Sequence, residues 1–184
     1  MSSSRERGPV VAISGRTRAG KTTLARALAE ATGWRQTSFS SYVRAEALRR
    51  EVARNRRELQ DLGAAMIEEQ GFTRFVAGML AEAELDPDAP FVVEGVRHLG
   101  TLAALRELTS PMEVRFLYLD VSDAERNRRL AAEGVSAEEG AEWEEHSTEA
   151  EVLEGLPEVA DLVIDADQPA DSVAKTALAF LGHA

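Results

Sequence analysis

A glycine-rich loop near the start of the chain constrains the fold more than any other feature. Residues 10–23 read VVAISGRTRAGKTT, and residues 15–22 match the pattern G-x-x-x-x-G-K-[ST] at every fixed position. Four apolar residues precede the loop, and Leu24, Leu28 and Ala31 follow it at helical spacing. The loop therefore joins a buried strand to a helix. This is the context that the pattern requires, and it predicts an α/β protein.

The fixed residues of this loop are of the types that bind phosphate. Glycines let backbone N–H groups curl around a phosphate, and the following helix adds the positive end of its dipole. Lys21 can reach the β- and γ-phosphates, and the Thr22 hydroxyl would be a Mg²⁺ ligand. We therefore predict a site for ATP and Mg²⁺ that comprises Gly15, Arg16, Thr17, Arg18, Ala19, Gly20, Lys21, Thr22 and Thr23.

A surface turn with a solvated lysine is the alternative interpretation of the loop. Lys21 is one of only two lysines among 21 basic residues, so arginine is the usual cation of this chain. A lysine at the one position where the pattern demands it favours the phosphate site.

Segments with strand and helix patterns alternate along the rest of the chain. Apolar runs predict strands at residues 9–13, 91–94, 114–119 and 162–164, with a weaker candidate near 36–39. Helical patterns cover about 42–54, 57–69, 72–84, 99–108, 123–132 and 170–181, and Gly71 separates two of them. This alternation predicts a parallel sheet with helices on both faces.

Length and composition indicate one globular domain. We expect residues 1–8 to be a flexible start and residues 9–184 to form a single domain. The chain has no cysteine, which excludes disulfides and thiolate chemistry and suits a reducing cytoplasm. No segment approaches the length of an apolar membrane span, so we expect a cytoplasmic protein without a membrane partner.

The charge of the chain is unevenly distributed. Its net charge is −11, and residues 130–174 contain 14 acids and no Lys or Arg. The other residues carry 21 − 18 = +3, which makes a nucleic-acid partner unlikely and leaves small anionic substrates possible. The acidic stretch is interpreted as a solvated helix face, with a docking surface for a basic partner as the alternative.

An acid and an arginine follow the second clear strand. The segment FVVEGVRHL places Glu94 at the end of an apolar run and Arg97 three residues later. Ligands of parallel sheets gather at the carboxyl ends of the strands, so both side chains should face the same crevice as the loop. Glu94 could hold Mg²⁺ or orient an attacking hydroxyl, and Arg97 could neutralise phosphoryl charge. The alternative is a strand-end acid paired with a nearby arginine for solubility.

Four segments in this order resemble small P-loop kinases: ISGRTRAGKTT, FSSYVRAEA, RRELQDLG and VVEGVRHLGTLAAL. This resemblance covers most of the chain. Among these kinases, the sequence is similar to the nucleoside monophosphate kinases and more closely to the dephospho-coenzyme A kinase-like group. It implies a three-layer P-loop NTPase fold with a five-stranded parallel sheet, a helical acceptor-binding region at about 40–85 and a lid at about 130–148.

The resemblance also implies roles for individual residues. An acceptor phosphate would be bound by Arg44 and Arg56, with Ser40, Gln60 and Arg97 completing the acceptor site. A solvated, arginine-rich helix face is the alternative for Arg44 and Arg56. In the lid region, Arg129 matches an arginine of the family pattern, and it would act in catalysis together with Lys21, Glu94 and Arg97. Arg126, one turn earlier, would contact the nucleotide.

One lid position departs from the family pattern. Glu133 stands before Gly134 where the family often has an arginine, and a carboxylate there repels phosphate. The resulting hypothesis is an ATP-dependent kinase that acts on a small nucleotide-like acceptor. A nucleoside monophosphate is the first choice and dephospho-coenzyme A the second, and a regulatory nucleotide-binding module without an acceptor is the rival from another class.

Overall fold

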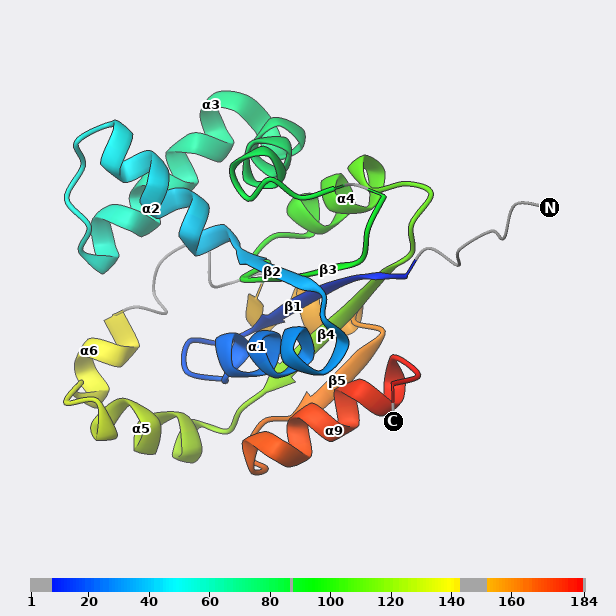
Figure 1. Ribbon diagram of the computed structural model, residues 1–184. Helices are drawn as coiled ribbons and strands as arrows, with labels where there is room; N and C mark the ends of the chain where they lie inside the picture. The colour runs from blue at the N-terminus through cyan, green and yellow to red at the C-terminus, as the bar shows by residue number, and fades with distance from the viewer. Residues whose placement is uncertain (1–7, 87, 143–151, 184) are drawn as a thin grey trace.

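Five parallel strands form the centre of the computed structural model, which describes residues 8–86, 88–142 and 152–183 (Figure 1). Their order in the sheet is β2-β3-β1-β4-β5. The bounds are β1 Val10–Gly15, β2 Arg35–Ser38, β3 Phe91–Glu94, β4 Val114–Asp120 and β5 Leu162–Asp165. Ile13 is level with Glu94 on one side and Leu117 on the other, so the strand ends that precede the expected site residues lie at one edge.

Helices cover both faces of the sheet, which confirms the expected three-layer fold. They are α1 Lys21–Thr32, α2 Phe39–Arg49, α3 Arg56–Glu82, α4 Leu99–Leu108, α5 Asp123–Ala132, α6 Ala137–Glu142, α8 Gly155–Glu158 and α9 Ala170–Phe180. Side chains alternate across β1: Val11 and Ile13 pack with α1 and α9, whereas Val10 and Ala12 pack with α2, α3 and α4. No helix among the described residues is long and apolar enough to cross a bilayer.

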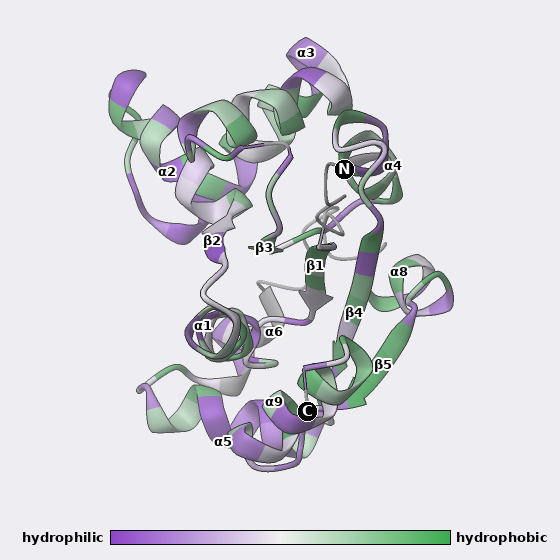
Figure 2. Cartoon of the chain, turned by 45° about the vertical axis from the view of Figure 1, so that its right-hand side comes forward, coloured by the Kyte–Doolittle hydropathy of each residue, from purple (hydrophilic) through white to green (hydrophobic). Residues whose placement is uncertain are grey.

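The colouring by hydropathy follows this division into core and surface. In Figure 2, β4 and β5 carry mainly hydrophobic residues, whereas α5 is mostly hydrophilic. Of the residues of α5, only Arg126 and Leu130 are buried, so this helix lies at the surface of the molecule. Helix α5 is therefore free to present charged side chains towards the loop that follows β1.

Two glycines are required by the geometry around the first helix. Gly15 has a φ of 142°, and a Cβ atom there would lie 2.6 Å from the carbonyl oxygen of Leu119. Gly33 ends α1 in the left-handed conformation and donates its N–H to the carbonyl of Ala29. At the Gly15 position, only glycine lets the backbone pass this close to β4 before α1 begins.

The helix expected at residues 42–54 was placed too late in the chain. Helix α2 begins at Phe39 because the Ser38 hydroxyl caps it by accepting the N–H of Ser41, and it ends at Arg49. Glu51 then takes a positive φ of 56°, which stops the helix. The two helices expected around Gly71 are confirmed as the two halves of α3, with Gly71 non-helical between them.

Candidate functional site

The glycine-rich loop wraps around the amino group of its own lysine. Lys21 Nζ donates to the carbonyl oxygen of Gly15 at 2.7 Å and to that of Arg16 at 2.8 Å. Arg16 directs its guanidinium the other way, to Asp123 on α5 at 2.7 Å. The loop thus holds a cation at its centre, and its backbone is shaped before any ligand binds.

A large cavity opens beside this loop and is called the loop cavity below. It has a volume of about 820 Å³, and residues 17–24, the C-terminal end of α5 and the segment after β5 contribute to its walls. Among the described residues, two carboxylates line it, Glu94 and Glu133. Seven cations of the described residues line it as well: Arg18, Lys21, Arg44, Arg56, Arg97, Arg128 and Arg129. The excess of positive charge suits a polyanion such as a triphosphate.

Burial perturbs the lysine in this cavity. Removal from water and, after it, the nearby positive charge of Arg97 lower the pKa of Lys21 to about 7, against the opposing effect of Glu94. In the absence of a ligand, part of the protein therefore carries a neutral Lys21 at neutral pH. Phosphate oxygens would favour the charged form and raise this pKa.

ATP binding above pH 7 is therefore expected to take up a proton. The triphosphate affinity should fall as the pH rises from about 7, by up to about tenfold per pH unit, because the empty protein must first be protonated. Below pH 7 the lysine is already charged and the affinity should level off. Calorimetry at pH 8 in two buffers of different ionisation enthalpy measures the uptake directly. Binding without proton exchange would show that Lys21 is fully charged in the empty protein.

Glu94 reaches the loop from the neighbouring strand. Its Oε1 accepts the hydroxyl proton of Thr22 at 2.7 Å, and both side chains line the loop cavity. The backbone after β3 bends towards β1, because the N–H groups of Gly95 and Val96 both donate to the carbonyl of Ile13. Two adjacent oxygen donors at the mouth of a phosphate site are the ligands that Mg²⁺ prefers, and it usually takes one or two carboxylates and completes its shell with phosphate and water.

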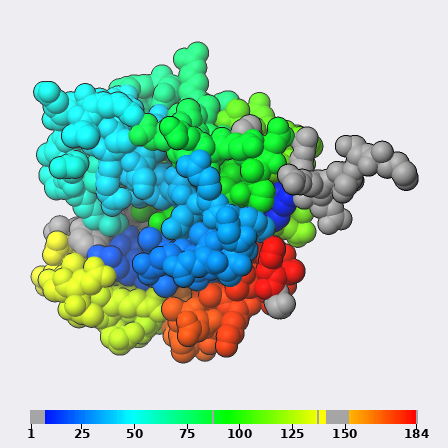
Figure 3. All heavy atoms as spheres, in the orientation of Figure 1, coloured from blue at the N-terminus to red at the C-terminus, as the bar shows by residue number. Residues whose placement is uncertain are grey.

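A second cavity, called the helical cavity, lies between the strand ends and the pair α2 and α3. Its volume is about 280 Å³. Ser40, Arg44, Arg56, Gly95 and Arg97 line both cavities, so the two spaces meet at these residues. In Figure 3, the cyan atoms of the α2 region and the yellow atoms of α6 lie on either side of the blue segment that contains the loop.

The helical cavity has a basic mouth and an apolar wall. Its arginines are Arg44, Arg54, Arg56 and Arg97, and no Asp or Glu is among the described residues that line it. The wall includes Val43, Leu59, Ile67 and Phe75, and Gln60 and His98 add polar atoms. The Thr101 hydroxyl is buried in this wall and has no hydrogen-bond partner within the described part of the chain.

The arginines at the junction repel one another. Burial together with the charge of Arg18 lowers the pKa of Arg56 to about 10, and burial together with the charge of Arg56 lowers the pKa of Arg97 to about 10. Arg56 also donates to the Thr17 hydroxyl at 2.6 Å, which links α3 to the loop. Both guanidinium groups stay charged at neutral pH, so an anion at the junction would relieve the repulsion.

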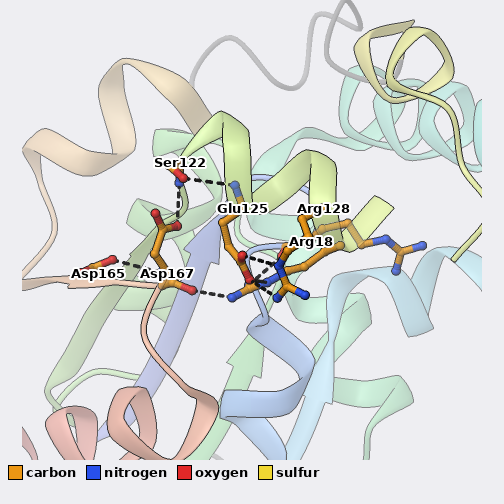
Figure 4. A network of polar contacts seen from close by, with 8 residues as sticks. Arg18, Ser122, Glu125, Arg128, Asp165 and Asp167 are labelled. Carbon is orange, nitrogen blue, oxygen red and sulfur yellow. Dashed lines mark hydrogen bonds and ion pairs between the residues drawn. The ribbon is translucent and has the colours of Figure 1, made fainter. Parts of the chain in front are cut away.

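Helix α5 links the loop to the segment after β5. Arg129 donates to the carboxylate of Glu125 at 2.7 Å, to the carbonyl of Arg18 at 3.0 Å and to that of Ala166 at 2.6 Å. Figure 4 shows the polar contacts in this region, with labels on Arg18, Ser122, Glu125, Arg128, Asp165 and Asp167. Arg129 is itself one of the residues that line the loop cavity. Because its guanidinium donates to backbone carbonyls of two segments, it also holds the edge of this cavity in place.

Two residues of the expected lid region make contacts that the sequence did not indicate. Arg126 is buried and donates to the carbonyl of Gly140 at 2.7 Å, so it holds α6 and does not line the loop cavity. Glu133, expected to repel phosphate, forms an ion pair with Arg18. Residues 143–148 of the expected lid lie outside the described residues.

The sequence analysis missed three features of the site. The Arg18–Glu133 pair joins distant segments, and nothing in either local pattern indicates it. Arg54 falls in an arginine-rich stretch, in which the sequence alone does not separate cavity residues from solvated ones. Thr101 is one of several small residues on an apolar helix, and its placement depends on how α3 packs over α4.

Comparisons with known proteins agree with this architecture. A family model described as AAA domain matches residues 11–154, and a search of curated proteins finds no match. The solved structures that are similar include a gluconokinase from Sinorhizobium meliloti 1021, with 18% identity, 97% of this chain and 94% of that chain covered, and a TM-score of 0.65.

Two further solved structures show the same fold. Shikimate kinase from Aquifex aeolicus vf5 has 14% identity and a TM-score of 0.53, with 94% of this chain and 95% of that chain covered. The APS kinase of Mycobacterium tuberculosis in complex with AMPPNP and APS has 15% identity and a TM-score of 0.57, with 96% of this chain and 98% of that chain covered. The expected resemblance to small P-loop kinases is confirmed at the level of the fold.

Proposed function

Since the chain belongs to the AAA domain family, we propose that it is a cytoplasmic kinase that transfers the γ-phosphoryl group of ATP to a small anionic acceptor. The observation that carries this proposal is the junction of the two cavities, where Arg44, Arg56 and Arg97 lie between the loop and a second binding space. A protein that only binds or hydrolyses ATP needs no second anion site beside the phosphates.

A nucleoside monophosphate is the acceptor that fits the helical cavity best. Its volume of about 280 Å³ is close to the lower end of ligand pockets, which span about 300 to 1,000 Å³. A compact acceptor fits this space, whereas most of the long chain of dephospho-coenzyme A would lie outside. The apolar wall suits a flat base, while a polyol would leave hydroxyl groups unpaired against it.

The acceptor and ATP would meet at the junction. The acceptor phosphate would lie on the basic mouth, with its base against Phe75 and Ile67 and a polar atom of the base within reach of the unpaired Thr101 hydroxyl. Phosphoryl transfer needs positioning and charge neutralisation more than covalent help. Lys21 and Arg97 would supply the positive charge around the transferring group.

Thr22 and Glu94 would hold Mg²⁺, which would neutralise charge on the β- and γ-phosphates. The geometry that supports this role is the 2.7 Å hydrogen bond between the two side chains at the mouth of the phosphate loop. Glu94 would also lie near the reacting oxygen of the acceptor, because the next residue, Gly95, lines both cavities.

Glu94→Gln is expected to lower the turnover number by about tenfold or more while leaving the ATP affinity within a few-fold. The amide keeps the shape and still accepts from Thr22, but it removes the charge that would organise Mg²⁺ or the acceptor. Titration of both proteins with ATP at several Mg²⁺ concentrations, together with turnover, measures the two effects. Unchanged turnover would mean that Glu94 is only a strand-end acid.

A panel of acceptors tests the function directly. The purified protein is incubated with ATP, Mg²⁺ and one candidate at a time, and phosphorylated products are identified by mass. The candidates are the common nucleoside monophosphates, dephospho-coenzyme A, gluconate, shikimate and APS. The expected result is stimulation of ATP consumption by a nucleoside monophosphate. Slow ATP hydrolysis that no acceptor stimulates would favour the regulatory module instead.

A further inference from the structure

Arg18 occupies a backbone conformation that disfavours a side chain. It has a φ of 69°, in the left-handed region where glycine fits without strain. The same loop uses glycine at its other positions of positive φ, Gly15 with 142° and Gly20 with 97°. The chain therefore keeps an arginine at a place where its backbone is unfavourable, and the reason must lie in the side chain.

The Arg18 side chain lies in the loop cavity, in contact with the end of α5. Its guanidinium forms an ion pair with Glu133, which is the residue that ends this helix. The Arg18 side chain is 35% exposed and that of Glu133 is 50% exposed, and both line the loop cavity. The pair is thus open to whatever enters the space beside the loop.

Arg18 also affects the other cations of the site. Its positive charge contributes to lowering the pKa of Lys21 and the pKa of Arg56. These are effects of close positive charges, so the Arg18 guanidinium belongs to the same cluster as the lysine that binds phosphate. Its Nε has no hydrogen-bond partner among the described residues, so the carboxylate does not satisfy the whole guanidinium.

We propose that Arg18 is a cation for the γ-phosphate that Glu133 holds aside while the site is empty. A triphosphate that enters the loop cavity would exchange the carboxylate of Glu133 for phosphate oxygens as the partner of Arg18. The phosphate loop itself thereby supplies a positive charge that the acidic lid lacks at position 133. This proposal rests on the proposed function only in requiring that a nucleoside triphosphate binds beside the loop.

The test compares nucleotides that differ in the γ-phosphate. Calorimetry measures the affinities of ADP and of AMPPNP, both with Mg²⁺, for the wild-type chain and for Arg18→Gly. We expect the variant to lose about tenfold to a hundredfold in AMPPNP affinity and little in ADP affinity, the range for one hydrogen bond to a charged group. Its melting temperature should stay equal or rise, because glycine relieves the unfavourable φ.

The Glu133→Gln variant tests the exchange itself. Loss of the competing carboxylate should strengthen AMPPNP binding by several-fold in the wild-type background. The matched control is Asp123→Asn, which breaks the other ion pair between the loop and α5, since the exposed Asp123 pairs with Arg16 outside the cavity. This control should leave the ratio of AMPPNP to ADP affinity unchanged.

Three results would overturn the proposal. Equal weakening of ADP and AMPPNP binding by Arg18→Gly would mean that the substitution only distorts the loop. Unchanged affinities together with a lower melting temperature would make the ion pair purely structural. A wild-type chain that binds neither ADP nor AMPPNP would refute the proposed function as well as the role of Arg18. The first two results would refute only the role of Arg18, so the two kinds of failure are distinguishable.

Discussion

Lys21→Ala is expected to abolish detectable phosphoryl transfer while the fold persists. The amino group lies inside the phosphate loop, bonded to the carbonyls of Gly15 and Arg16, and it contributes nothing to either apolar core. Its removal takes away a charge placed where the transition state develops negative charge. Loss of one such preorganised donor costs on the order of 3 to 4 kcal/mol, or roughly two to three orders of magnitude in turnover.

Circular dichroism and ATP consumption, measured on the same preparation, separate loss of chemistry from loss of fold. Lys175→Ala is the matched control, because Lys175 is the only other lysine of the chain and lies exposed on α9. It should change neither property. A folded Lys21→Ala protein with full activity would remove the basis for assigning the loop to ATP.

The elements that were predicted well are those with a strong local signal. β1, β3 and β4 are nearly continuous apolar runs because both faces of the sheet are covered, and they are visible in the sequence for that reason. The strand β2 reads RQTS, which is polar throughout, and two of its four residues are exposed, so its pairing with β3 shows only in the structure. The end of α2 was missed because it depends on the backbone of Glu51.

The candidate site divides in the same way. The loop, Glu94 and Arg97 could be placed beforehand, because a motif and the ends of neighbouring parallel strands determine where they lie. The ion pair of Glu133 with Arg18 could not be foreseen, since the two residues come from distant segments. The meeting of the two cavities likewise depends on how α2 and α3 pack, which no local pattern encodes.

The Arg44→Ala variant is expected to raise the acceptor KM by about ten- to a hundredfold and to leave the ATP affinity nearly unchanged. Arg44 is exposed, lines both cavities and has no hydrogen bond or ion pair to another described residue. Its guanidinium is therefore available to an acceptor phosphate, which it can bind with two parallel hydrogen bonds. A charge-assisted contact of about 1.5 to 3 kcal/mol corresponds to the expected change.

Steady-state kinetics with the acceptor identified in the panel measure the effect. Arg44→Lys should recover only part of it, because the charge returns without the planar fork. Arg57→Ala is the control for a general loss of positive field, since Arg57 is exposed, adjoins Arg56 in the sequence and does not line either cavity. Equal effects of Arg44→Ala and Arg57→Ala on the acceptor KM would indicate an unspecific basic face. The proposal that Arg44 binds the acceptor phosphate would then have to be abandoned. It would no longer distinguish a kinase from a regulatory nucleotide-binding module.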